Sequence, residues 1–179
     1  MLEDILNAKH SGIFIVISAL IAFIGGWLIN SYGRWKDANS LRKNIASAFY
    51  GEIIALLNLA KRRKYLGQLK ELRKIIASES DLFAVRVPIN KNSFKVYDNN
   101  IGSIGILKHP LPSKISRFYI MVSMILGDLK SFQTEEFDKL PKDIKLKSID
   151  ESIANLKYCI KIGYKIKFDL EKEIKFSKK

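Results

Sequence analysis

The sequence predicts an all-α protein with one N-terminal transmembrane helix followed by a cytoplasmic helical-bundle domain. Two observations lead to this fold class. An uncharged run extends from Ser11 to Gly33, and the rest of the 179-residue chain repeats apolar residues at helical spacing. Only four prolines and ten glycines interrupt the chain, so long helices are expected. We expect residues 1–35 to form the N-terminal segment with its span, and residues 36–179 to form the helical domain.

The uncharged run is predicted to cross a bilayer. As a helix rising about 1.5 Å per residue it would extend roughly 35 Å, and a bilayer core is about 30 Å thick. The preceding segment, MLEDILNAKHS, is slightly acidic, unlike the basic start of a cleaved signal peptide. A buried helix of a soluble protein is the alternative, because Ser18, Asn30 and Ser31 are polar. The residues expected at the membrane interface are Trp27, Tyr32, Arg34, Trp35 and Lys36.

The distribution of charge predicts the orientation of the span. Of the 31 lysines and arginines, only Lys9 precedes the run. The positive-inside rule therefore places the short N-terminus outside and the helical domain in the cytoplasm. A lone cysteine, Cys159, fits a reducing compartment. The net charge of +13 indicates an anionic neighbour, which would be inner-leaflet lipid, RNA or an acidic protein surface.

The first helix after the span is expected from about Lys36 to Ala77. Its centre, IIALLNLA, is apolar almost all round, which predicts burial in the domain core or against another subunit. The core or oligomer positions are Ile53, Ile54, Leu56 and Leu57. The stretch KRRK then interrupts the apolar stripe with a basic patch of Lys61, Arg62, Arg63 and Lys64. This patch would contact phosphates, rest on lipid or face solvent.

The remaining elements follow from turn residues and apolar spacing. A break is expected at ASESDLFAVRVPINKNS, and a short helix follows with apolar residues from Phe94 to Leu107. A third helix is expected from Ile115 to Phe132. After the loop TEEFDKLPKD, a last helix carries apolar residues from Ile149 to Ile174.

No catalytic residue, metal site or cofactor is predicted. His10 and His109 lack the clustered donors of a metal site, and the chain has no P-loop, GxSxG or dinucleotide fingerprint. Cys159 lies near the apolar stripe of the last helix, which favours a small buried hydrophobe over a nucleophile. Glu52, inside YGEIIALL, either pairs with a basic residue of a neighbouring helix or faces water.

The clearest local pattern in the span is a ladder of small residues. Ser18, Ala22 and Gly26 are spaced four apart, and Asn30 is next on the same line. Small residues let helix backbones approach closely in lipid, so this face predicts packing between copies of the chain in a homo-oligomer, or the lining of a pore. Ordinary spacing of small residues in an apolar helix is the alternative. A single span cannot form a channel alone, so a pore would require several subunits.

The layout resembles a family of small single-span membrane proteins from bacterial type VI-B CRISPR loci. The similarity covers the whole chain and is one of architecture: the uncharged run from Ser11, the YGEIIALL helix and the stretch NNIGSIGILKHPLPSKISRFY. It implies a divergent HEPN-like region, an inner-membrane location, and pores that strengthen antiviral defence beside an RNA-guided, RNA-targeting effector. The HEPN nuclease pattern, an arginine followed four to six residues later by a histidine, is absent from this chain.

Three functional hypotheses follow. The first is an oligomeric protein of the lipid bilayer that forms a pore or perturbs the inner membrane when an RNA-guided CRISPR effector activates it. The second is a membrane-tethered RNase of degenerate HEPN type, which the absent arginine–histidine pattern argues against. The third is a passive membrane scaffold that recruits a cytoplasmic partner. RNA binding has no motif in its support, because aromatic residues do not interleave the KRRK patch.

Overall fold

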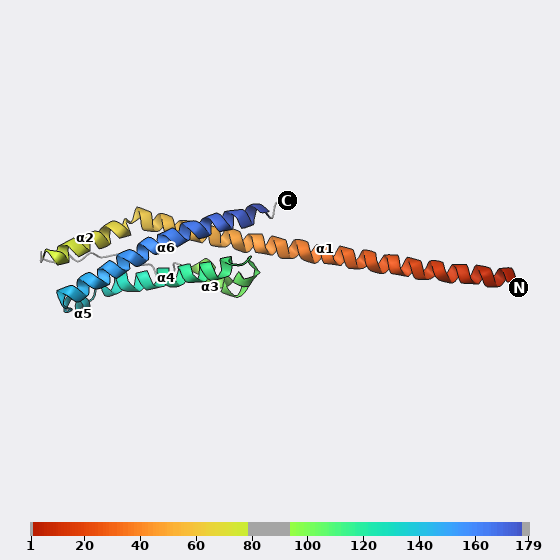
Figure 1. The fold of residues 1–179 in the computed structure, drawn as a ribbon, viewed down its shortest axis with the longest axis horizontal. Helices are drawn as coiled ribbons and strands as arrows, with labels where there is room; N and C mark the ends of the chain where they lie inside the picture. The colour runs from red at the N-terminus through yellow and green to blue at the C-terminus, as the bar shows by residue number, and fades with distance from the viewer. Residues whose placement is uncertain (1, 79–93, 177–179) are drawn as a thin grey trace. The chain divides into compact units, whose positions relative to one another are not determined.

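The computed structural model describes the backbone of residues 2–78 and 94–176, and the side chains of residues 22–78 and 94–175. Within these ranges every regular element is a helix, so the all-α prediction is confirmed. The elements are α1 (Leu2–Arg62), α2 (Tyr65–Ala77), α3 (Lys95–Asn100), the 3-10 helix η1 (Ile101–Ile106), α4 (Leu111–Ser131), α5 (Glu135–Asp138) and α6 (Lys142–Phe176) (Figure 1). They form two compact units, Met1–Leu41 and Arg42–Lys179.

The predicted transmembrane helix is wrong. Among the residues that the structure describes, no helix is both long enough and apolar enough to cross a bilayer. The apolar stretch with described side chains, residues 22–33, rises about 18 Å, and a bilayer core is roughly 30 Å thick. From Arg34 onward the same helix, α1, carries charged residues. The single-pass topology and the inner-membrane location were both deduced from this span, so they are corrected with it.

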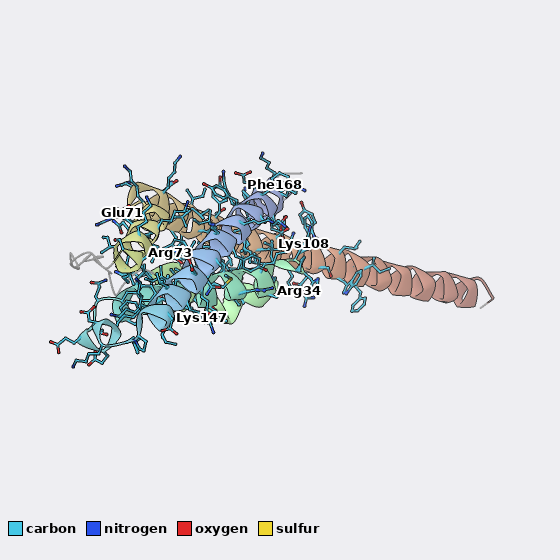
Figure 2. All side chains as sticks on the ribbon, turned by 60° about the vertical axis from the view of Figure 1, so that its left-hand side comes forward. Arg34, Glu71, Arg73, Lys108, Lys147 and Phe168 are labelled. Atoms are coloured by element: carbon cyan, nitrogen blue, oxygen red, sulfur yellow. The ribbon has the colours of Figure 1, made fainter. Side chains whose placement is uncertain are left out.

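The core of the second unit forms around α6. This helix packs against α2 on one flank and α4 on another (Figure 1). It runs antiparallel to the α1–α2 side, because Leu57 lies against Gly163 near its middle and Arg73 pairs with Asp150 nearer its start. Figure 2 labels Arg73 on α2.

The predicted apolar centre of α1 contributes to this core. Ile53 and Leu57 are buried, whereas Ile54 and Leu56 are half-buried. The packed face of α6 supplies Ile149, Leu156, Cys159, Ile166 and Leu170. Burial raises the pKa of the Cys159 thiol to about 11, as the prediction of a buried, unreactive cysteine implies.

The helix predicted over Lys36–Ala77 is two helices. α1 ends at Arg62 and α2 begins at Tyr65. Of the two residues between them, Arg63 and Lys64, the second adopts a left-handed conformation with φ of 52°. No glycine or proline marks this turn in the sequence, so the apolar periodicity on either side predicts one continuous helix.

The short helix α5 lies inside the segment TEEFDKLPKD, which the sequence predicts to be a loop. Residues 79–93, where the sequence predicts a break, lie outside the described residues.

Glu52 joins three elements of the second unit. Its carboxylate accepts hydrogen bonds from the backbone N–H groups of Val96 (2.8 Å) and Tyr97 (3.0 Å) in the first turn of α3. It also accepts the hydroxyl of Tyr119 on α4 at 2.5 Å. Burial and this bond raise the pKa of Tyr119, whose ring is stacked on Tyr97 at 4.2 Å. The three donors to Glu52 are uncharged groups of α3 and α4 rather than the predicted basic residue, and its side chain is half-buried.

Gly163 permits the close approach of α6 to α1 and α4. A Cβ added at Gly163 would lie 2.9 Å from Leu57 Cδ2 and 2.9 Å from Phe118 Cε2, and Phe118 is almost fully buried. We expect Gly163→Ala to lower the free energy of unfolding by about 1–3 kcal/mol, because the added methyl group overpacks the core. Chemical denaturation followed by circular dichroism measures this change.

Gly127, in the last third of α4, provides the matched control. A Cβ there would meet nothing within 4 Å, so Gly127→Ala should raise the free energy of unfolding by about 0.5–1 kcal/mol through helix propensity alone. Equal effects of the two substitutions would contradict the packing at Gly163.

Removing the Glu52 carboxylate should destabilise the second unit. In Glu52→Ala, two backbone N–H groups and the buried Tyr119 hydroxyl lose their acceptor, and each unsatisfied buried group costs about 1–3 kcal/mol. We expect a loss of about 3 kcal/mol or more in urea denaturation. Tyr119→Phe removes one donor but leaves the two backbone bonds in place, so it should cost about 1 kcal/mol. A Glu52→Ala variant as stable as Tyr119→Phe would show that the backbone bonds contribute little.

Candidate nucleic-acid interface

The small-residue ladder lies in the first unit. Ala22, Gly26 and Asn30 are exposed on α1, and a Cβ on Gly26 would meet no atom within 4 Å. Ser18 lies outside the described side chains. The described part of the chain therefore offers this face no packing partner, and association of copies through it stays a prediction.

The residues predicted for a membrane interface also lie on α1 in the first unit. Trp27, Tyr32, Arg34, Trp35 and Lys36 are all exposed. The rings of Tyr32 and Trp35 lie 6.0 Å apart. These residues share one helical segment of α1.

The basic patch Lys61–Lys64 is the turn between α1 and α2. All four side chains are exposed. Within the described residues, no ion pair joins any of them to a carboxylate. We call this segment the basic turn.

A second basic surface lies on the solvent side of α6, in its C-terminal half, where Figure 2 labels Phe168. At about 100° per residue, eight exposed side chains fall within an arc of about 120° on the side opposite the packed face. We call this surface the α6 stripe. Its members are Lys157, Tyr158, Lys161, Tyr164, Lys165, Phe168, Lys172 and Lys175.

The aromatic members of the α6 stripe are unusually open to solvent. The exposed fractions are 42% for Tyr158, 52% for Tyr164 and 56% for Phe168. Cations lie over two of the rings: Arg117 of α4 is 5.4 Å from the Tyr158 centroid, and the Lys172 ammonium is 4.2 Å from that of Phe168. Lysines alone are ordinary on the outer face of a helix, but three aromatic rings within the same arc are not. The arrangement presents cations and ring faces together.

The three carboxylates of the same half of α6 lie outside the arc of the stripe, and each of them contacts another helix. Asp169 pairs with Lys114 of α4 at 2.7 Å. Glu171 accepts the Tyr50 hydroxyl at 2.7 Å, which holds the pKa of Glu171 below its usual range. Glu173, only 6% exposed, lies 3.0 Å from Arg42 of α1.

The contacts of these carboxylates affect the charge of the surface. The sequence of α6 alternates acidic and basic residues after Phe168, so the face would be nearly neutral if all of them pointed outward. Asp169 and Glu173 pair with Lys114 of α4 and Arg42 of α1, and Glu171, at the edge of the arc, lies near Lys167 and Lys175. The lysines of the outer arc therefore outnumber the carboxylates beside them. The result is a positively charged strip that rises about 27 Å from Lys157 to Lys175.

A cavity among the described residues has the opposite charge. It has a volume of about 420 Å³ and lies between α4, α5 and the start of α6, with Asp128, Glu136 and Glu151 among its lining residues. Asp128 accepts the hydroxyl of the buried Ser152 at 2.5 Å. No group of three or more metal-ligating side chains occurs in the described part of the chain.

The α6 stripe was not predicted from the sequence, although the regular spacing of its lysines and aromatic residues can be read there. Lys157, Lys161 and Lys165 are four residues apart, and each aromatic residue of the stripe falls within one turn of at least one of these lysines. Testing aromatic interleaving against every basic segment, rather than against KRRK alone, would have found it. The inward direction of the carboxylates has no such signal, since it depends on partners in α1 and α4.

Comparisons of the chain with protein-family models, with curated proteins and with solved structures found no match. The resemblance to CRISPR-associated membrane proteins is therefore neither supported nor contradicted by these comparisons, and it stays a prediction.

Proposed function

We propose that this protein binds single-stranded nucleic acid along the α6 stripe. The observation that carries the proposal is the interleaving of exposed lysines with exposed aromatic rings on one arc of α6, without a carboxylate among them. Proteins that bind single strands without sequence preference combine these two features: a positive surface that follows the phosphates and rings on which bases stack.

The lysines and the aromatic residues of the stripe have different chemical roles in this proposal. The ammonium groups of Lys157, Lys161 and Lys165 would contact phosphates and release bound counterions, which makes the affinity depend on salt. Tyr164 and Phe168 would stack on unpaired bases, a contact worth about 1–3 kcal/mol per base. Arg117 beside Tyr158 adds a cation at the edge of the strip, contributed by α4 rather than α6.

The surroundings of α6 favour a single strand over a duplex. A helix that reads duplex DNA enters the major groove, which is about 12 Å wide, so it must stand clear of its neighbours. α6 is flanked by α2 and α4 along much of its length (Figure 1). Bases in a duplex are also stacked on one another, so rings on the protein surface cannot reach their faces.

The pattern is also unlike that of a helix lying on a lipid surface. Such helices separate a basic face from an apolar face that enters the bilayer. In α6 the apolar face is packed in the core, and the exposed rings share an arc with the lysines. Protein partners are a weaker alternative because lysine is depleted at the centre of protein interfaces.

The three hypotheses drawn from the sequence, a pore, an RNase and a scaffold, are affected differently by the structure. The pore hypothesis depended on the transmembrane helix and is not carried further. The RNase and scaffold hypotheses, and an RNA-guided effector as partner, stay predictions. Binding along α6 requires neither catalysis nor a membrane, and the bound strand is expected to be recovered uncut.

Substitutions in the stripe should separate its two contributions. Lys157→Gln with Lys161→Gln and Lys165→Gln should reduce the slope of log affinity against log salt by about 2, since each phosphate contact contributes about 0.7 on a single strand. Tyr164→Ala with Phe168→Ala should instead weaken binding at every salt concentration, by about 5-fold or more per ring, with little change in slope. Fluorescence anisotropy with a labelled uridine oligonucleotide measures both.

The matched control removes the same number of charges elsewhere. Lys70, Lys74 and Lys130 are exposed on α2 and α4, and their triple change to Gln should leave the affinity near that of the wild type. An equal loss in the control would show that only net charge matters. If the stripe variant lost binding to phosphatidylserine vesicles but kept the oligonucleotide, the stripe would be a lipid-facing surface and the proposal would be contradicted.

A further inference from the structure

We infer that a strand bound on the α6 stripe continues onto the basic turn, Lys61–Lys64, so that the protein selects long single strands over short ones. This inference rests on the proposed function and extends its site to a second element. Three features of the basic turn support the inference: the position of the turn, its uncompensated charge and its backbone conformation.

Two contacts fix the position of the basic turn along α6. On one side of the turn, Leu57 lies against Gly163, and on the other side Arg73 pairs with Asp150. The turn therefore lies beside the part of α6 between Asp150 and Gly163, which contains Lys157, the first residue of the stripe. Figure 1 shows the junction of α1 and α2 alongside the middle of α6.

The charge of the basic turn is uncompensated, in contrast to that of three cations of the second unit that pair with α6. Arg42, Arg73 and Lys114 each pair with a carboxylate of α6. The four cations of the turn form no ion pair with any described carboxylate, although they are consecutive in sequence. Like charges so close repel one another, and an anion laid across them relieves that repulsion.

The backbone of the turn holds these side chains at one place. Lys64 is the sole described residue other than glycine with a positive φ (52°), a conformation that glycine adopts without steric cost. The Lys64 N–H donates to the Lys61 carbonyl at 3.1 Å, and the Gln68 N–H donates to the Lys64 carbonyl at 2.9 Å. The last turn of α1 and the start of α2 thus meet with their cations adjacent. Residues other than glycine that are held in the left-handed region cluster at functional segments.

The consequence is a dependence on strand length. A strand of about 6 nucleotides lies within the range of sites held by one stacking surface, and the stripe alone accommodates it. A strand of about 20 nucleotides extends beyond the start of the stripe and reaches the basic turn. The longer strand therefore makes more phosphate contacts, and its affinity falls more steeply with salt.

The experiment compares two uridine oligonucleotides, of about 6 and about 20 nucleotides, in salt titrations with the full chain. The junction variant is Lys61→Gln, Arg62→Gln, Arg63→Gln and Lys64→Asn, where asparagine tolerates the left-handed conformation. With the longer strand, the salt slope should fall by about 1.4–2.8, equal to two to four phosphate contacts. With the shorter strand, it should not change. A control variant changes Lys70, Lys74, Lys130 and Lys139, all exposed, to Gln.

The outcomes separate the inference from the proposed function. If the wild type binds neither strand, the proposed function fails. If the wild type binds both and the junction variant matches it on the longer strand, only the inference fails. Equal losses in the junction and control variants, or an equal loss on both strands, would also overturn it. The pair Arg62→Gln and Arg63→Gln, which keeps Lys64, repeats the test should circular dichroism show that the fourfold variant is unfolded.

Discussion

The pairing of three α6 carboxylates with α1 and α4 is the interaction on which the rest of the second unit depends. Glu173 is buried, so leaving it without Arg42 would place an uncompensated charge in the core, at a cost of about 3–5 kcal/mol. Asp169 and Glu171 fix the rotation of α6 by binding Lys114 and Tyr50 on opposite flanks. In that rotation, the lysines and aromatic rings of the stripe, which lie opposite the packed face of α6, point to solvent.

The packing around α6 supports the same rotation. Gly163 lets Leu57 and Phe118 approach the helix, and a larger residue there would push α6 away from both neighbours. Glu52 ties α1 to α3 and α4 through three hydrogen bonds, which holds the aromatic cluster of Phe49, Tyr97 and Tyr119 in place. Core geometry and surface chemistry are thus linked, because the residues that orient α6 inward also determine what it presents outward.

Local patterns predict much of this fold and little of its site. Apolar spacing predicts the helices and the burial of Ile53 and Leu57, because that signal lies within each segment. The turn at Lys64 carries no glycine or proline, so the same signal joins α1 and α2. An uncharged run satisfies the length criterion for a span, yet the described part of α1 is not apolar over a sufficient length. The partners of Glu52 and Glu173 lie in distant segments, and no pattern in one segment specifies them.

Photocrosslinking tests the central claim most directly. A uridine strand carrying 4-thiouridine, irradiated in complex with the full chain and digested, identifies the peptides that touch the bases. We predict that the main crosslinks fall on Tyr158, Tyr164 or Phe168, since these rings are the stacking surface. Crosslinks confined to other helices, with none between residues 157 and 175, would contradict the account.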